Sequence, residues 1–412
     1  MLLTILLIIV FSSIFLIIEL LVQRKVFSIR KDFPWLITEK DETPILSKTG
    51  LTKFISHGYD PELGWIRKPF TMHDENGKYS KTEWHINKIG ARSNPLFDGL
   101  ESTISCYGDS FAFSRQVNDD ETWSHHLSEI TNTNVLNFSV GNYGVDQSLL
   151  RLKREYAKNK TKIVILAVVP ETISRIQSMW KHYSEYGNTF GFKPRFVIVD
   201  DKLTLLKNPI DSSSKFELFT EYLDHIQQND FFYKNKFLKE KLHFPYSITI
   251  LKNLRRNFGI ISSIDKINKL KKQNKDFSHI AWNPMRIIMQ NNKQWRIRLF
   301  KDSGSCKLLK MIIQNYVDYS KQQNFHPIFI FLPQKDDLIF IKNNSHFFEN
   351  FSNELKSMDG LTLIDVTNDL LRKKDLGILY SDNNDYGGHF SKEGNKLISE
   401  LIARQLKNLN LI

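Results

Sequence analysis

Apolar and polar positions follow two patterns along this chain, and together they predict an α/β core. Five short apolar runs indicate strands, at residues 102–107, 134–138, 162–169, 327–332 and 361–366. Continuous apolarity, as in 162–169, is typical of a parallel strand that is buried on both faces. Apolar residues at helical spacing predict helices at 121–130, 147–158, 305–322 and 391–406. We therefore expect a five-stranded parallel sheet covered by helices.

The regular alternation of strands and helices stops after the third strand. Residues 171–325 are aromatic and basic, without repeats, and we expect a large, mostly helical insertion there. Residues 23–100 are turn-rich, with one strand-like alternation at 84–87, and are predicted to form an N-terminal extension. The predicted domains are a segment 1–22, the extension 23–100, and a core at 101–412 that contains the insertion.

Residues 1–22 are almost wholly apolar and about as long as a bilayer-spanning helix. No basic residue precedes the run and no small-residue cleavage site follows it, which favours an uncleaved anchor over a signal peptide. Four basic residues, Arg24, Lys25, Arg30 and Lys31, follow the run. By the positive-inside rule, these four charges favour a location of the core domain in the cytoplasm. We predict a single-pass protein of the cell membrane and leave the side of the core open.

The net charge of +12 is concentrated in one part of the chain. Residues 234–276 carry 12 Lys or Arg against three acidic residues. Solvated helix faces would explain this excess, and so would a surface that contacts anionic lipid or a phosphorylated glycan carrier. No nucleic-acid-binding motif accompanies the charge, so we expect no nucleic-acid partner. The two cysteines, Cys106 and Cys306, give neither a disulfide framework nor metal-ligand spacing, so we expect no metal.

A short sequence, Gly108-Asp109-Ser110, follows the first predicted strand. A strand, a tight turn and a helix start would expose the serine hydroxyl at the sheet edge, close to N–H groups that bind anions. The tripeptide alone is weak evidence, because Ser110 could be an ordinary helix cap. A second segment, 385–389, contains Asp385 and His389 just before the last helix. Serine, histidine, an acid and the loops at 137–147 and 168–172 are the parts of an acyl-transfer site.

With these motifs the chain resembles the SGNH/GDSL hydrolase family, over roughly 101–170 and 326–408. It is most similar to membrane-anchored bacterial members that carry Gly-Asp-Ser-Phe, an Asn-x-x-x-Gly loop ending in Tyr-Gly-x-Asp-Gln, and a final His before a helix. The resemblance implies a flavodoxin-like three-layer sandwich and no cofactor. It also implies that Ser110 is the nucleophile and His389 the general base, with N–H groups of Ser110 and of the Gly141–Asn142 loop as the oxyanion hole.

The chain departs from the family pattern at three places. The family's triad Asp stands three residues before the His, where this chain has Tyr386; we expect Asp385 to take the role, with Asp382 as the alternative. Asn142 stands where the family often has glycine, and asparagine tolerates a positive φ. The family's Gly-x-Asn-Asp block is replaced by Val169-Pro170-Glu171-Thr172. The candidate substrate-binding residues are Asp109, Tyr143, Glu171 and Thr172.

These features favour an esterase or O-acyltransferase anchored in the membrane, with membrane lipid as a partner. The expected substrate is an acyl ester of a cell-surface carbohydrate or a lipid-linked glycan, and the acyl acceptor is either water or a sugar hydroxyl. Aromatic residues of the insertion could stack on sugars, although such residues more often form a core: Trp180, Tyr183, Phe190, Phe192, Trp282 and Trp295. The alternative is a catalytically silent module that binds a glycan or an assembly partner at the membrane.

Overall fold

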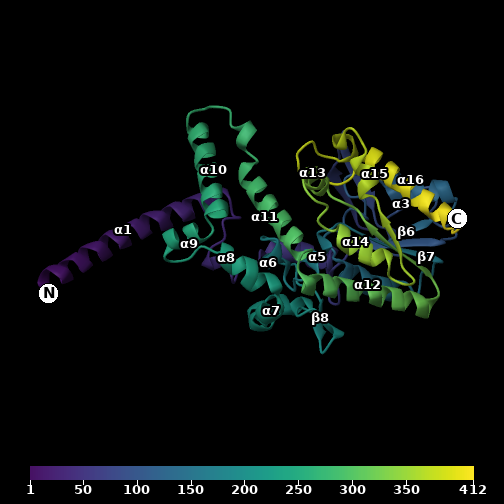
Figure 1. Cartoon of the computed structure of the whole chain (residues 1–412), viewed down its shortest axis with the longest axis horizontal. Helices are drawn as coiled ribbons and strands as arrows, with labels where there is room; N and C mark the ends of the chain where they lie inside the picture. The colour runs from purple at the N-terminus through teal and green to yellow at the C-terminus, as the bar shows by residue number, and fades with distance from the viewer. The chain divides into compact units, whose positions relative to one another are not determined.

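A computed structural model describes residues 1–412 and contains two compact units (Figure 1). The first unit consists of residues 1–47, 180–191 and 220–294. The second consists of residues 48–179, 192–219 and 295–412. Each unit has a hydrophobic core of its own, and the two are described in turn.

The second unit is built on a five-stranded parallel sheet with the strand order β11-β10-β7-β5-β6. The five strands are β5 (Ile104–Gly108), β6 (Val135–Asn137), β7 (Ile163–Val168), β10 (His326–Phe331) and β11 (Thr362–Asp365). They coincide with the five apolar runs of the sequence, so the predicted parallel sheet is confirmed. In the central register, Cys106 of β5 lies between Asn137 of β6 and Ile165 of β7.

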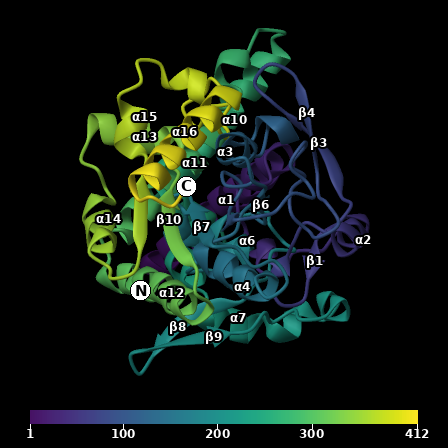
Figure 2. The ribbon, with the colours of Figure 1, turned by 90° about the vertical axis from the view of Figure 1, so that its right-hand side faces the viewer.

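Helices cover both faces of this sheet (Figure 2). On one face lie α3 (Trp123–Thr131) and α16 (Lys392–Asn408), whose Leu127 and Ile398 share a core with Ile104 and Cys106. On the other face lie α4 (Val145–Glu155) and α12 (Ser303–Gln323). The hydroxyl of Tyr316 on α12 donates to the carbonyl of Val164 at 2.7 Å. The three-layer arrangement implied by the resemblance is therefore present.

Three antiparallel hairpins complete the strands of this unit. They are β1 (Tyr59–Asp60) with β2 (Gly64–Trp65), β3 (Met72–Asn76) with β4 (Lys81–His85), and β8 (Arg195–Val199) with β9 (Lys202–Leu206). Trp84 of β4 packs edge-on against Phe113, with ring centroids 5.2 Å apart, and this contact brings the second hairpin to the segment after β5. The remaining helices are α2 (Lys48–His57), α5 (Thr172–Arg175), α13 (Lys335–Asn343), α14 (Glu349–Lys356) and α15 (Thr367–Leu371).

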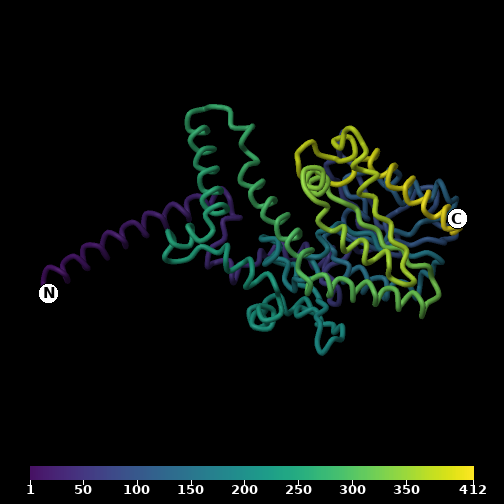
Figure 3. The backbone as a smooth tube through the Cα atoms, in the orientation of Figure 1, coloured from purple at the N-terminus to yellow at the C-terminus, as the bar shows by residue number.

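The first unit is helical and begins with α1 (Leu2–Asp32), which is long and apolar enough to cross a membrane. Every residue from 1 to 18 is exposed, whereas Val26 and Ile29 are buried against α10 (Leu254–Lys272). Figure 3 traces the chain through α10 and back through α11. The other helices of the unit are α6 (Lys181–Ser184), α7 (Leu223–Asn229), α8 (Leu238–Glu240), α9 (Tyr246–Lys252) and α11 (Asn283–Leu299), of which residues 283–294 belong here.

Candidate active site

Ser110 lies in the turn that follows β5, at the carboxyl end of the sheet. A side chain at Gly108 would collide with the carbonyl oxygen of Ala167 on β7, so glycine alone allows this close approach. The carboxylate of Asp109 accepts the N–H of Val169 at 2.9 Å. The turn is therefore tied to β7 as well as to β5, and it holds Ser110 at the sheet edge.

The segment that follows Ser110 differs from the sequence prediction. Residues 110–116 form successive turns, and the first helix, α3, begins only at Trp123. Ser114 and Gln116 have positive φ values of 58° and 75°, and a right-handed helix cannot contain such residues. The helix that was expected to start directly at Ser110 is therefore absent.

The structure brings Ser110 and His389 together across 279 positions of sequence. The Oγ of Ser110 lies 2.8 Å from Nε2 of His389. Gly388, with φ of 66°, makes the bend before the histidine, and the imidazole packs against the ring of Phe111 at 4.8 Å. Ser110 is buried and His389 is partly exposed. This pair has the geometry of a hydroxyl nucleophile and its base.

Gln116 occupies the other side of the imidazole. Its Oε1 accepts three hydrogen bonds: from Nδ1–H of His389 at 2.8 Å, from the backbone N–H of His389 at 3.0 Å, and from the hydroxyl of Ser381 at 2.8 Å. Its Nε2 donates to the carbonyl of Asn76 at 2.8 Å. Because Oε1 can only accept, the proton of the neutral ring is held on Nδ1 and Nε2 is left to face Ser110.

Neither carboxylate expected at this position reaches His389. The N–H of Asp382 donates to the carbonyl of Gly387 at 2.9 Å, and the N–H of Gly387 donates to the carbonyl of Asn384 at 3.0 Å. Asp385 therefore lies at the exposed end of a closed turn, without a hydrogen bond or ion pair. The carboxylate of Asp382 accepts the N–H of Asn384 at 2.8 Å instead.

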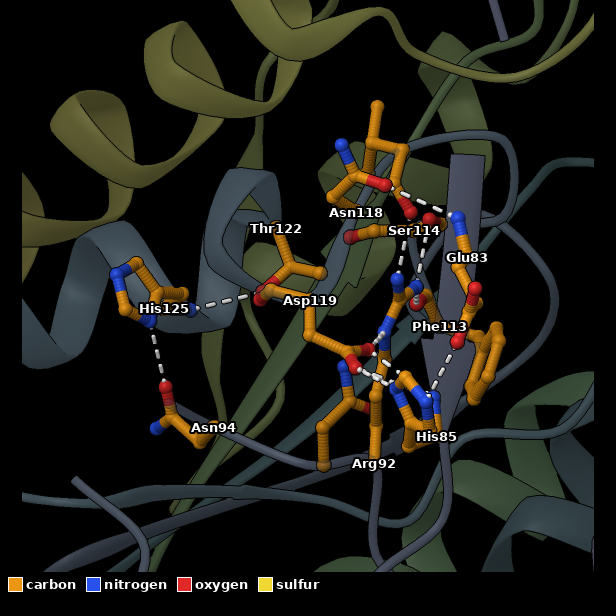
Figure 4. A network of polar contacts seen from close by, with 12 residues as sticks. Glu83, His85, Arg92, Asn94, Phe113, Ser114, Asn118, Asp119, Thr122 and His125 are labelled. Atoms are coloured by element: carbon orange, nitrogen blue, oxygen red, sulfur yellow. Dashed lines mark hydrogen bonds and ion pairs between the residues drawn. The ribbon is translucent and has the colours of Figure 1, made fainter. Parts of the chain in front are cut away.

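Arg92 holds the segment that carries Gln116, and Figure 4 shows it beside Phe113, Ser114 and Asp119. Its Nη1 donates to the carbonyls of Phe113 at 2.6 Å and Ser114 at 2.8 Å, and its Nη2 donates to the carbonyl of Val117 at 2.6 Å. Its Nε donates to the carboxylate of Asp119 at 2.8 Å. The guanidinium is almost completely buried and binds the segment on both sides of Gln116. It positions this segment and is not available to a substrate.

The environment of His389 favours the neutral imidazole. Burial, together with the positive charges of Arg115, Arg175 and Arg67, lowers the pKa of His389 to about 3. No carboxylate opposes this shift, since Gln116 is uncharged. At neutral pH the ring therefore carries no charge, and Nε2 can accept a proton from Ser110.

The N–H groups of Ser110 and Gly141 have no acceptor within the protein. A Cβ placed on Gly141 would lie 3.8 Å from the Cβ of Ser110, so the two residues are adjacent. The indole N–H of Trp65 donates to the carbonyl of Gly141 at 2.9 Å and fixes this peptide. Asn142 has φ of 68°, the left-handed conformation that asparagine tolerates. The loop therefore has the form that an oxyanion hole requires, with free N–H groups beside Ser110.

The four candidate substrate-binding residues are all engaged by other parts of the protein. Asp109 accepts a hydrogen bond from Arg175 at 3.0 Å, in addition to that from Val169, and is fully buried. The hydroxyl of Tyr143 donates to the carbonyl of Trp65. Glu171 pairs with Arg296 at 2.7 Å. The hydroxyl of Thr172 accepts the N–H of Val145 at 2.8 Å, at the start of α4. The structure thus places them around the site as support.

Two residues of the site escaped the sequence analysis, Gln116 and Arg67. Gln116 lies six positions after Ser110, in a stretch without a motif, and only the left-handed turn at 114–116 brings it to His389. Arg67 lies in the N-terminal extension, where a basic residue next to Lys68 looks like any other surface charge. No group of three or more His, Cys, Asp or Glu side chains is placed to hold a metal ion.

Searches with the sequence found no matching family model and no matching curated protein. Several solved structures align with the chain. A proposed lipolytic protein of the G-D-S-L family from Desulfitobacterium hafniense DCB-2 is 13% identical, with a TM-score of 0.33, and the alignment covers 74% of this chain and 98% of that one. A psychrotrophic esterase from Pseudoalteromonas sp. is 10% identical, with a TM-score of 0.31, and the alignment covers 76% and 100%.

A lipase/acylhydrolase from Enterococcus faecalis is 12% identical to this chain. Its TM-score is 0.31, and the alignment covers 75% of this chain and 96% of that one. The aligned structures are thus lipolytic proteins and esterases, the kind of protein that the sequence motifs resemble.

Proposed function

We propose that this protein is an ester hydrolase in which Ser110 is the nucleophile and His389 the general base. The observation that carries the proposal is the distance of 2.8 Å between Oγ of Ser110 and Nε2 of His389. A neutral imidazole at this distance can take the hydroxyl proton as the oxygen attacks a carbonyl carbon. The free N–H groups of Ser110 and Gly141 then donate to the carbonyl oxygen as it gains negative charge.

The reaction has two halves, with an acyl-enzyme between them. In the first half, Oγ of Ser110 bonds to the acyl carbon while His389 accepts the proton; the ester C–O bond then breaks, and His389 returns the proton to the departing alcohol. In the second half, the acceptor loses a proton to His389 and attacks the acyl carbon, and Ser110 leaves with that proton. Water as acceptor gives hydrolysis, and a sugar hydroxyl as acceptor gives O-acyl transfer.

Gln116 acts in this mechanism as a positioning residue. Its amide oxygen keeps the proton on Nδ1 and so keeps Nε2 of His389 available to Ser110. An amide carries no charge, however, and stabilises the imidazolium ion less than the carboxylate of a Ser-His-Asp triad does. We therefore expect slower turnover than a complete triad would give.

The second candidate function is a catalytically silent module that binds a glycan or an assembly partner. It is favoured by the absence of a carboxylate at Nδ1 and by the three arginines that lower the pKa of His389, because both make the imidazole a weak base. The free N–H groups beside Ser110 favour catalysis, because a binding module has no need of an oxyanion hole.

We also propose that α1 attaches the protein to a membrane. Glu19, buried within α1, accepts the N–H of Ser247 on α9 at 3.2 Å. Three large apolar side chains in and next to α9, those of Phe244, Ile248 and Leu251, are exposed. An exposed apolar surface that joins the exposed half of α1 is best explained by contact with lipid. Because α1 continues into the core of its unit, an uncleaved anchor fits better than a removed signal sequence.

The proposed substrate is an acyl ester of a carbohydrate or of a lipid-linked glycan. Fewer observations support it than the sequence indicated, because three of the aromatic residues that could stack on sugars are buried. Trp180, Tyr183 and Phe192 are 0%, 1% and 1% exposed, so these three aromatic side chains belong to cores and do not stack on sugars. Trp282 is 42% exposed and keeps a face for such a contact. The membrane anchor remains the main support for a lipid-linked or cell-surface substrate.

A serine-reactive fluorophosphonate probe and a small acyl ester test the proposal together. We expect the probe to label the protein but not the Ser110→Ala variant. Ser110→Ala and His389→Ala should each remove nearly all ester hydrolysis, and the double variant should be scarcely worse, because groups that act as one unit are not additive. Folded protein that neither reacts with the probe nor hydrolyses esters, but binds glycan, would establish the silent module instead.

A further inference from the structure

Arg67 is the one arginine beside the proposed nucleophile that has no partner of its own. Its guanidinium lies against the rings of Trp84 at 4.1 Å and Phe113 at 4.5 Å, which are themselves in edge-on contact. It forms no ion pair and no hydrogen bond, and its Nε is buried without an acceptor. Burial, with smaller contributions from Arg115 and Arg92, lowers the pKa of Arg67 to about 9, so it still carries its charge at neutral pH.

Three other arginines around the site are each paired with a carboxylate. Arg115 holds Glu75 with two bonds of 2.7 and 3.0 Å. Arg175 holds the carboxylate of Asp109 at 3.0 Å, and Arg92 holds Asp119 as described above. These three pairs are each close to neutral, whereas the charge of Arg67 is not compensated. A buried cation without a counterion costs free energy, and an anion that enters from outside removes this cost.

The position of Arg67 relative to Ser110 follows from Gly141. A Cβ placed on Gly141 would lie 3.6 Å from Nη2 of Arg67 and 3.8 Å from the Cβ of Ser110. Arg67 and Ser110 thus approach the same glycine, within the length of a small acyl chain. A group bound by Arg67 would lie a few bonds from an ester carbonyl placed at Ser110.

The shape of the free part of Arg67 indicates which anion it binds. The rings of Trp84 and Phe113, which are nearly perpendicular to each other, pack against the guanidinium, and the N–H groups at the edge of this planar group have no acceptor within the protein. That edge is a fork of N–H groups, which matches the two oxygens of a carboxylate or phosphate. The single negative oxygen that forms on the ester carbonyl does not require this fork of donors, because the free N–H groups of Ser110 and Gly141 can donate to it.

We propose that Arg67 binds an anionic group of the substrate, a carboxylate or phosphate within a few bonds of the ester, so that the enzyme selects negatively charged esters. This inference rests on the ester hydrolysis proposed above. The charged group lies on either the acyl or the alcohol part of the substrate, and it forms a paired contact with the guanidinium edge while Ser110 attacks the carbonyl.

Two matched pairs of esters test the selectivity. The acyl-side pair is 4-nitrophenyl hemisuccinate and 4-nitrophenyl butyrate, which have the same chain length. The alcohol-side pair is 4-acetoxybenzoate and its methyl ester. We expect kcat/KM to favour the anionic member of one pair, and Arg67→Gln to remove about 10- to 100-fold from that ester alone, as expected for a charge-assisted bidentate contact. The ratio of the two kcat/KM values within that pair is the measured quantity, and it should fall toward one in the variant.

Three variants complete the comparison. Lys68→Gln removes the same charge from the adjacent residue, whose ammonium group donates to the carbonyl of Ile55 at 2.7 Å, and it should leave the selectivity unchanged. Arg67→Lys keeps the charge without the fork, so it should lose an intermediate factor, and it replaces Arg67→Gln if that variant does not fold. An equal loss on charged and neutral esters would assign Arg67 to the oxyanion and overturn the proposal, as would a wild-type enzyme without charge preference.

A binding measurement separates this proposal from the proposed reaction. In Ser110→Ala, which cannot form an acyl-enzyme, calorimetric titration with succinate should show binding that is about tenfold or more weaker in Ser110→Ala/Arg67→Gln. Binding of this kind without hydrolysis of any ester would leave the anion site standing while the esterase function failed. Equal binding to both proteins would overturn the anion site, whatever the activity.

Discussion

His389 combines a favourable position with an unusual electrostatic environment. Its Nε2 faces Ser110, but its Nδ1 meets the neutral Gln116 instead of a carboxylate. Three arginines lower its pKa further below the ordinary value of a histidine. The imidazole is therefore available as a base over a wide pH range, but weakly basic, and the negative charge of a bound substrate would offset part of this weakness.

The pH dependence of kcat/KM checks this description of His389. Activity requires the neutral ring, and its pKa is lowered to about 3, so the rate should hold from pH 7 to about 5 and decline only at lower pH. Gln116→Glu supplies a carboxylate at Nδ1, raises the pKa of His389, and should move the acid limb to higher pH. A wild-type acid limb near pH 6.5 would contradict the assignment.

The pH dependence of folding stability is a second, independent test of the lowered pKa of His389. The unfolded chain binds a proton at His389 below about pH 6.5, whereas the folded chain does not until about pH 3. The contribution of His389 to stability is therefore fully present above pH 6.5 and is lost as the pH falls toward 3. Urea unfolding at each pH separates this loss from the loss of catalytic activity.

At the level of structural elements, the segment 113–119 follows the Ser110 turn and carries Gln116. It has no regular secondary structure apart from one short helical turn at its end, and Arg92 binds its carbonyl groups from within. The N-terminal extension thus contributes two residues to the proposed site of the second unit. Arg92 positions Gln116, the partner of His389, and Arg67 adds a positive charge beside Ser110.

Replacement of Arg92 should be among the most damaging changes outside the proposed nucleophile and base. Arg92→Met removes the guanidinium from the buried carboxylate of Asp119, which keeps its contacts with His85, and breaking a buried pair costs about 3–5 kcal/mol of unfolding free energy. Arg404→Met, which removes an exposed pair with Asp369, should cost less than about 1 kcal/mol. Urea unfolding compares the two, and equal losses would show that Arg92 has no special structural role.

At the level of the whole molecule, the N-terminal segment and the insertion build one unit together. The N–H of Leu242 donates to the carbonyl of Ile37 at 2.9 Å, and α1 shares its core with α10. Val26 and Ile29 of α1 are 0% and 2% exposed. The apolar N-terminal helix thus has two parts. Residues 1–18 are exposed and about long enough to cross a membrane, whereas the part that contains Val26 and Ile29 belongs to the core of the unit.

Two truncations distinguish these halves of α1. Deletion of residues 1–18, all exposed, should release the protein from membranes and leave its first unit folded, apart from salt-sensitive binding by basic α10. Deletion of residues 1–32 also removes Val26 and Ile29, and each such buried side chain contributes about 2–5 kcal/mol. That deletion should make the unit sensitive to proteolysis. Recovery of the full-length protein in the soluble fraction would refute the anchor.

The sequence by itself determined the sheet, its helices and the pairing of serine with histidine. Apolar runs record burial on both faces of a strand, and a parallel sheet brings the carboxyl ends of its strands to one edge. Ser110 and His389 follow such strands, so their meeting could be inferred across the whole core. The left-handed conformation of Asn142 could also be inferred, because few residues other than glycine tolerate it.

Only the tertiary structure decided what surrounds that pair. The partner of Nδ1 depends on two left-handed residues, Ser114 and Gln116, and on a closed turn that carries Asp385 away from His389. Neither feature leaves a periodic or compositional trace. The role proposed for Arg67 depends on the aromatic rings that pack against it and on its lack of a counterion. Such properties arise from distances between segments, and a sequence records residues but not those distances.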